Sequence, residues 1–173
     1  MTAVLTAAVV VLAALTAVCL LMLAAVVRRL RTIEERLNGP AATLPEVGLT
    51  VAGFQAADLT ATPLNESDVE DGTVLFVMPG CGPCADLIAA LAEHPSGALT
   101  AFVAGNPADE VTQELARKVG AVADRVAVVD EGGAVTAAFG GVSSFPTVLR
   151  ISGGVIAAAG RSVDAVAPTL VAA

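Results

Sequence analysis

The sequence predicts an α/β protein with a mixed central sheet, preceded by one N-terminal transmembrane helix. Three observations carry this prediction. Apolar runs alternate with helical patterns from residue 73 to residue 141, an order typical of strands connected by crossover helices. Two further apolar runs flank Ser152, Gly153 and Gly154, and these predict a closing hairpin. The third observation is an uncharged apolar stretch of 26 residues at the start of the chain, which is long enough to span a membrane.

The apolar stretch of residues 2–27 is interpreted as a membrane anchor. It contains no charged residue, proline or glycine, and Arg28 and Arg29 follow it directly. At about 1.5 Å per residue it forms about 39 Å of helix, and the hydrocarbon core of a bilayer measures about 30 Å. A cleaved signal peptide is the alternative, but such peptides begin with basic residues, carry a shorter apolar run and end at small residues. The pattern therefore favours a single-pass anchor.

Residues 28–47 are interpreted as a stalk and linker. Leu30, Ile33 and Leu37 recur at helical spacing before Gly39-Pro40 ends the pattern. This short helix is either a solvated stalk or a coiled-coil contact with a second copy, although two turns alone are only marginally stable.

Net charge separates the stalk from the rest of the chain. The whole sequence has 9 basic and 17 acidic residues, a formal net charge of −8, and the stalk contributes four arginines against two glutamates. The remaining five basic and 15 acidic residues give a net charge of −10. Nucleic acid needs a basic face and is not expected as a partner, whereas the acidity favours solubility and basic partners.

Residues 48–173 are predicted to form one domain. Residues 49–59 predict a short strand or hairpin, and the continuous apolar run 73–78 predicts a strand buried on both faces. Residues 84–93 predict a helix that stops before His94 and Pro95. His94 is expected at the surface, at the end of this helix.

The second half of the domain continues the alternation. Residues 98–105 and 125–130 predict strands. Residues 106–120 predict a helix, because they have an acidic first turn, a basic last turn and a closing Gly120. The elements expected after these are a short helix or turn in 132–141, two strands in 147–160, and a terminal helix in 162–173 that Pro168 interrupts.

The cysteines limit the chemistry of the domain. Cys19 lies in the predicted anchor, so only Cys81 and Cys84 can act together. A structural zinc site needs four ligands, and the domain has a single histidine and no second cysteine pair. A purely structural disulfide here would close too small a loop to remove much entropy from the unfolded chain. A redox-active pair is the preferred interpretation, without a metal or a cofactor.

The segment "TVLFVMPGCGPCADL" suits redox chemistry. It places Cys81 between a strand and a helix, where the unpaired N–H groups and the helix dipole favour a thiolate and lower the pKa of the thiol. Cys84, one turn further on, is expected to attack the mixed disulfide and release the substrate. Gly82 lets a partner approach, and Pro83 fits the first helical turn.

Several segments resemble the thioredoxin superfamily. "VGLTVAGFQAADLTATPL" is similar to the first segment of its domain, "DGTVLFVMPGCGPC" to its central strand and active site, and "FPTVLRISGGVIAAAG" to its cis-proline segment and hairpin. Within the superfamily the chain resembles the membrane-anchored TlpA-like and ResA-like thiol-disulfide oxidoreductases. The anchor and the Arg-rich stalk ending in Gly-Pro are similar to those of the methylamine-utilisation accessory protein. The resemblance implies a thioredoxin-like fold.

This resemblance also implies roles for particular residues. Pro146 occupies the cis-proline position, and Phe145, directly before it, is expected to face the disulfide and help select the substrate. With the redox pair, the resemblance assigns catalysis to Cys81 and Cys84 and substrate binding to Gly80, Gly82, Pro83, Phe145 and Pro146.

Two positions depart from the family pattern. Thioredoxins usually have an aromatic residue directly before the first cysteine, and here it is Gly80. They often have a buried carboxylate six residues before that cysteine, where this chain has Leu75. Proton transfer to and from Cys84 is then expected to rely on water.

Other conspicuous residues are given structural interpretations. The acidic residues before the central strand are expected to form a solvated loop: Glu66, Asp68, Glu70 and Asp71. Four phenylalanines are too scattered along the chain for a stacking platform and are expected in the core: Phe54, Phe76, Phe102 and Phe139.

These features together predict a membrane-tethered thiol-disulfide oxidoreductase. It would reduce or isomerise disulfides in protein substrates and would be recharged by a separate electron-donor thiol protein. The Gly-Pro pair between the cysteines resembles that of thioredoxin and favours a reductant. The alternative is a thioredoxin-like maturation or client-binding module for a partner enzyme, with secondary redox activity.

The side of the membrane is predicted from two opposing arguments. The arginines after the anchor favour a cytoplasmic domain by the positive-inside rule. The resemblance implies the opposite, because the anchored family members act outside the cytoplasm, and a tether holds a redox domain at a surface from which it would otherwise diffuse away. We expect a single-pass protein of the cell membrane with an extracytoplasmic domain.

Overall fold

A computed structural model describes Met22, residues 44–93 and residues 98–166. The predicted anchor apart from Met22, the stalk up to residue 43, His94 and the end of the predicted terminal helix lie outside the described residues. Within the described part of the chain, no helix has the length and apolar character needed to cross a membrane.

A five-stranded mixed sheet forms the centre of the domain. Its strands are β3 (Gly72–Val77), β4 (Leu99–Ala104), β5 (Arg125–Val129), β6 (Thr147–Ser152) and β7 (Val155–Gly160), and their order is β5-β4-β3-β6-β7. Strands β3, β4 and β5 run parallel, whereas β6 is antiparallel to β3 and to β7. The predicted mixed sheet and its closing hairpin are therefore confirmed, with Gly153 and Gly154 at positive φ in the turn.

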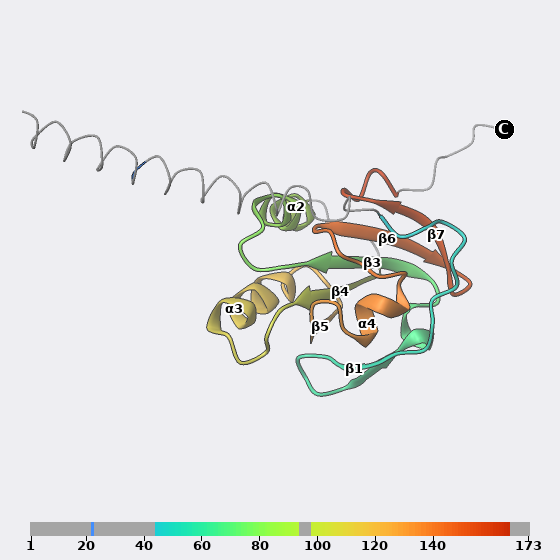
Figure 1. The fold of residues 1–173 in the computed structure, drawn as a ribbon, viewed down its shortest axis with the longest axis horizontal. Coiled ribbons are helices and arrows are strands. Elements are labelled where there is room, and N and C mark those ends of the chain that lie inside the picture. Colours follow the sequence, from blue (N-terminus) through green and yellow to red (C-terminus); the bar gives the residue numbers. More distant parts are fainter. Residues whose placement is uncertain (1–21, 23–43, 94–97, 167–173) are drawn as a thin grey trace, which may run out of the picture. The chain divides into compact units, whose positions relative to one another are not determined.

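Helices cover both faces of this sheet. Helices α2 (Gly82–Glu93) and α3 (Glu110–Val119) pack on one face, and the short helix α4 (Ala134–Ala138) and the segment before β3 pack on the other. Figure 1 shows α2 and α4 on opposite sides of β3 and β6. Both faces of β3 are covered, so side chains on both faces of the strand are apolar. This explains the continuous apolar run in the sequence.

Alternation along β3 divides the core into two apolar clusters. Val74 and Phe76 point to the α4 side, and Leu75 and Val77 point to the side of α2 and α3. The four phenylalanines expected in the core are all buried and meet on the α4 side, with ring centroids 5.1 to 5.7 Å apart. The core prediction is confirmed, and residues scattered in sequence form one aromatic cluster.

The segment before β3 forms a hairpin and closes the edges of the sheet. Strands β1 (Gln55–Ala57) and β2 (Pro63–Asn65) are antiparallel, and the 3-10 helix η1 (Glu66–Val69) follows them. At one sheet edge the Leu59 N–H donates to the Val126 carbonyl, and at the other the Ile156 N–H donates to the Leu49 carbonyl. These contacts leave less of each edge strand open to pairing with another chain.

Three expected elements differ in the structure. Helix α3 begins at Glu110 rather than at residue 106, because the Asn106 side chain accepts the Ala108 N–H and holds a turn there. Residues 162–166, the described part of the predicted terminal helix, are bends and turns. The acidic residues before β3 are exposed as expected, but they lie in and around η1, which Asn65 and Asp68 cap reciprocally.

Asp58 ties the β1–β2 hairpin to β5. Its Oδ1 accepts from the Thr60 hydroxyl at 2.7 Å and from the backbone N–H groups of Thr60 and Thr62 at 2.9 Å. Its Oδ2 accepts from Arg125 Nε at 2.8 Å. These hydrogen bonds, with the Thr60 hydroxyl first, lower the pKa of Asp58 from 3.8 to about 2. The carboxylate therefore stabilises the folded state wherever it is ionised.

The Asp58→Asn variant should be less stable than the wild type at pH 7. Because the folded-state pKa is depressed, the contribution of Asp58 is fully present above the unfolded-state pKa of about 4 and is lost as the pH falls to about 2. Urea unfolding from pH 7 down to pH 2 should show the two proteins converging at the acid end. Asp86→Asn, at an exposed position on α2, is the control. A stability difference that stays constant across this range would contradict the assignment.

Candidate functional site

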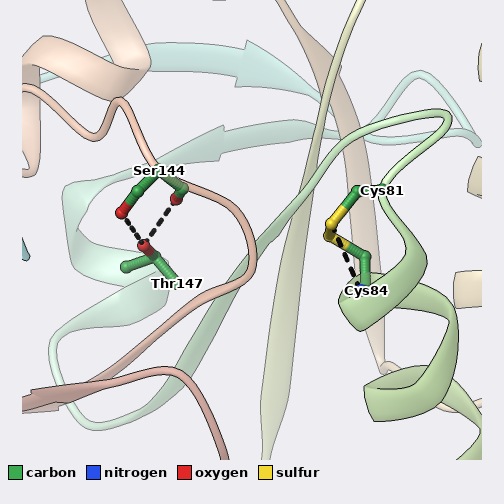
Figure 2. The surroundings of a disulfide bond; sticks show 4 residues. All are labelled: Cys81, Cys84, Ser144 and Thr147. Carbon is green, nitrogen blue, oxygen red and sulfur yellow. Dashed lines mark hydrogen bonds between the residues drawn. A yellow bond between two sulfur atoms is a disulfide. The ribbon is translucent and has the colours of Figure 1, made fainter. Parts of the chain in front are cut away.

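The candidate site is the Cys81–Cys84 disulfide where β3 leads into α2. The two Cα atoms are 5.2 Å apart, and the bond lies at the first turn of the helix (Figure 2). The predicted position of Cys81 at the helix N-terminus is confirmed. Cys84 is 1% exposed, whereas Cys81 is only partly buried at the margin of the same apolar cluster. Cys81 is therefore the sulfur that a partner can reach.

Cys81 caps the first turn of α2. Its carbonyl accepts the Ala85 N–H at 3.3 Å, and its Sγ accepts the Cys84 N–H at 3.2 Å. This is the arrangement of an N-cap residue, with sulfur in place of the usual oxygen. Pro83, which directly precedes Cys84, has no N–H to compete for the sulfur. In the reduced protein the same donor and the helix dipole would stabilise a thiolate on Cys81.

Cys84 lies in an apolar environment. It belongs to the buried apolar cluster that contains Leu75, Val77, Leu87 and Leu91. Leu75 is fully buried at the position where the family often has a carboxylate. Burial in apolar surroundings favours the neutral thiol at Cys84 over the thiolate. The two cysteines thus differ both in access and in the charge state that their surroundings favour.

The glycines on either side of Cys81 differ in backbone conformation. Gly80 has a φ of +73°, a region in which a side chain is strained. This backbone conformation favours glycine at the position directly before Cys81. Gly82 is exposed, and an added Cβ there would have no atom within 4 Å. Both glycines, with the exposed Pro83, leave the surface next to Cys81 open.

The Phe145–Pro146 peptide bond is cis, which confirms the prediction for this segment. Pro146 is buried, and Phe145 is half-buried and packs against both apolar clusters, one of which contains Cys84. Pairing of Phe76 with Thr147 places the start of β6 beside the end of β3. The sheet therefore brings Phe145 and Pro146 to the same edge as the chain that leads to Cys81, as predicted.

Ser144 and Thr147 were not identified from the sequence. Both are buried, and the Thr147 hydroxyl donates to the Ser144 carbonyl at 2.7 Å and lies 3.4 Å from the Ser144 hydroxyl. These bonds close the turn around the cis peptide, and in Figure 2 the loop between Ser144 and Thr147 bends toward the side of the picture on which the disulfide is drawn. A Ser/Thr pair flanking Phe-Pro was the available signal, because such hydroxyls bond to nearby backbone groups.

Within residues 44–93 and 98–166, no group of three or more His, Cys, Asp or Glu side chains has an arrangement that could hold a metal ion. The geometry at Cys81 and Cys84 is suited to exchange of a disulfide with an external thiol or disulfide, because one sulfur is accessible and the other is bonded to it.

Comparisons with known proteins identify the fold. Searches with protein-family models and with curated proteins give no match. The structure is similar to the thioredoxin domain of a thiol-disulfide oxidoreductase from Bacteroides vulgatus, with 15% identity, a TM-score of 0.54, and coverage of 69% of this chain and 91% of the other. It is also similar to a thiol:disulfide interchange protein from Bacteroides sp., with 14% identity, a TM-score of 0.53, and coverage of 66% and 81%.

A third similar structure is a secreted disulfide oxidoreductase from Mycobacterium tuberculosis. Its identity is 16%, its TM-score is 0.50, and the match covers 65% of this chain and 86% of the other. At these identities the likeness concerns the fold. The described domain has a thioredoxin-like fold with a disulfide at the start of its α2 helix.

Proposed function

We propose that this protein is a thiol-disulfide oxidoreductase that reduces or isomerises disulfides in client proteins through Cys81 and Cys84. The observation that carries the proposal is the asymmetry of the pair. Cys81 is accessible and its sulfur accepts a helix N-terminal N–H, whereas Cys84 is 1% exposed and surrounded by apolar side chains. Such a pair has one nucleophile for substrates and one internal thiol for resolution.

The reaction proceeds by two thiol-disulfide exchanges. In the dithiol form the Cys81 thiolate attacks one sulfur of the client disulfide, which forms a mixed disulfide and releases the other client sulfur as a thiolate that takes up a proton. Cys84 then loses its proton to water and attacks the Cys81 sulfur. The second client thiol leaves, and the Cys81–Cys84 disulfide remains. Two electrons pass to the client, and an external thiol protein must return them.

The surroundings of Cys81 suit an extended client segment. The backbone at Phe145 can pair with such a segment, as a sheet edge pairs with an added strand. The half-buried Phe145 side chain offers it an apolar contact, and Gly80 and Gly82 present no side chain that would obstruct it. Phe145 is accordingly proposed to contribute to substrate selection.

Turnover of a protein disulfide tests the proposal. The dithiol form should reduce the interchain disulfides of insulin at a rate that depends on protein concentration, and its reduction potential should lie nearer to about −270 mV than to about −120 mV, as expected of a reductant. A client-binding module would retain clients without changing their disulfides. Absence of both insulin reduction and disulfide isomerisation would reject the proposed activity.

We further propose that residues 2–27 anchor the domain in the cell membrane and that the domain lies outside the cytoplasm. Support comes from the 26-residue apolar stretch and from the resemblance to anchored oxidoreductases. After mild reduction of intact cells, a membrane-impermeant thiol reagent should label Cys81. Labelling that occurs only after lysis would place the domain in the cytoplasm, as the arginines after the anchor favour.

A further inference from the structure

A hollow of about 390 Å³ adjoins the loop that carries Phe145. Its lining residues come from the loop after β5, from α4 and from the loop before β6: Glu131, Gly132, Thr136, Ala137, Gly141, Val142 and Ser143. The hollow is separate from the redox pair, since neither Cys81 nor Cys84 lines it. Its last lining residue, Ser143, precedes Phe145 by two positions.

Hydrogen bonds connect several of the residues that line this hollow. The carbonyl of the buried Thr136 accepts the N–H groups of Gly141 at 3.0 Å and of Val142 at 3.1 Å. The Thr136 hydroxyl donates to the Gly133 carbonyl at 2.9 Å. The loop before β6 is thereby attached to α4, and the hollow is a preformed feature of the fold, as ligand sites usually are.

Glu131 gives the hollow its charge. It is the one charged residue among those that line it, it is exposed, and its carboxylate has no ion pair or hydrogen bond within the described residues. The positive φ of Gly132 (+71°) and Gly141 (+78°) favours glycine there, and an added Cβ at either position would meet no atom within 4 Å. The mouth is therefore open, and its one acidic side chain, Glu131, has no partner within the described residues.

The topology places this hollow at the end of the sheet where the parallel strands finish, which is also the end that leads to Cys81. The loop after β5 leaves the same ends of the parallel strands as the chain between β3 and Cys81, and ligands of open α/β sheets bind at these ends. An extended chain advances about 3.3 Å per residue. A client segment that pairs beside Phe145 therefore reaches Ser143, at the rim of the hollow, within about two residues.

We infer that this hollow is a client subsite that takes a lysine or arginine side chain located a few residues from the client's disulfide cysteine, with Glu131 as its ionic partner. This inference rests on the proposed oxidoreductase function and adds the substrate class to it. The domain selects clients with a basic residue beside the reactive disulfide, through a contact distinct from the general attraction of its net negative charge.

Disulfide-linked peptides that differ at one position test this subsite. Each peptide carries Lys, Gln or Glu two to four residues before or after its cysteine. For the best placement, the wild type should reduce the Lys peptide with a kcat/KM about three- to fivefold above that of the Gln peptide, the range of a solvent-exposed ion pair. Raising the salt concentration to about 0.5 M should weaken this preference.

Substitutions separate the subsite from other effects. Glu131→Gln should remove the Lys preference without changing turnover of the Gln peptide, and Glu131→Lys should reverse it in favour of the Glu peptide. Ala137→Phe, at an exposed position of the hollow, should reduce the preference by filling the space. Asp86→Asn makes the same charge change as Glu131→Gln but lies on α2, so it should leave the preference intact.

Binding provides a readout that does not need redox activity. In the protein with Cys81→Ser and Cys84→Ser, fluorescence anisotropy should show the same preference for the Lys peptide and the same loss in Glu131→Gln. If no peptide is reduced but this preference remains, the proposed activity fails and the subsite stands. An unchanged preference in Glu131→Gln, or an equal loss in Asp86→Asn, would overturn the subsite.

Discussion

Cys84→Ser protein is expected to accumulate client proteins as mixed disulfides on Cys81, and Cys81→Ser protein is expected to accumulate none. In the first variant the accessible thiolate still attacks, but the internal thiol that resolves the adduct is missing. In the second variant the nucleophile is lost, and insulin reduction should fall by at least about a thousandfold, as with other enzymes that lose their nucleophile. The measurement is non-reducing electrophoresis of alkylated lysate, with the bonded residue identified by mass spectrometry.

This asymmetry follows from the different surroundings of the two sulfurs. Cys81 is half-buried at the cap of α2, and Cys84 is 1% exposed in an apolar cluster. Asp86→Asn, which leaves both thiols in place, should behave like the wild type and serves as the control. Stable adducts on Cys84 in the Cys81→Ser protein, with none on Cys81 in the Cys84→Ser protein, would reverse the assignment.

Phe102→Ala is expected to destabilise the domain by about 3 to 5 kcal/mol, the usual cost of deleting a buried phenylalanine ring. Phe102 is fully buried and contacts three other rings, with centroids 5.1 Å from Phe76 and 5.7 Å from Phe54 and Phe139. The cost combines the lost transfer free energy, the cavity left behind and the aromatic contacts. It is a large share of the about 5 to 15 kcal/mol that stabilises a typical domain.

Urea unfolding of the oxidised protein measures this effect as a lower midpoint with an unchanged slope. Val111→Ala is the matched control, because Val111 is 64% exposed and its truncation should change the free energy of unfolding by less than about 0.5 kcal/mol. A loss below about 1 kcal/mol in Phe102→Ala would show that the four rings do not form a close-packed cluster in solution.

The buried Leu75, at the position where thioredoxins often have a carboxylate, bears on the rate of the second exchange. Cys84 must lose a proton before it attacks, and its cluster is composed of apolar side chains such as Leu75 and Leu87. Water reaching the mixed disulfide is then the proton acceptor. Under the proposed function, we therefore expect the lifetime of the mixed disulfide to depend on solvent access to Cys84.

The parts of the site that depend on neighbouring residues were determined by the sequence alone. A strand, a Cys-Gly-Pro-Cys segment and a helix predict Cys81 at a helix N-terminus, since capping and proline effects act within one turn. The Ser152-Gly153-Gly154 turn predicts the β6–β7 hairpin for the same reason. The cis bond before Pro146 was also predicted, through resemblance of the local segment to the thioredoxin superfamily.

Only the tertiary structure decided which distant residues meet. Asp58 and Arg125 are 67 positions apart, and they pair because β1 closes the edge of β5. The phenylalanine cluster depends on the order of the strands, and the hollow at Glu131 depends on the return of the chain from α4 to β6. The periodicity of a segment specifies which of its faces is buried but not the partner that buries it. Strand order, and the contacts that follow from it, are chosen by the packing of the whole core.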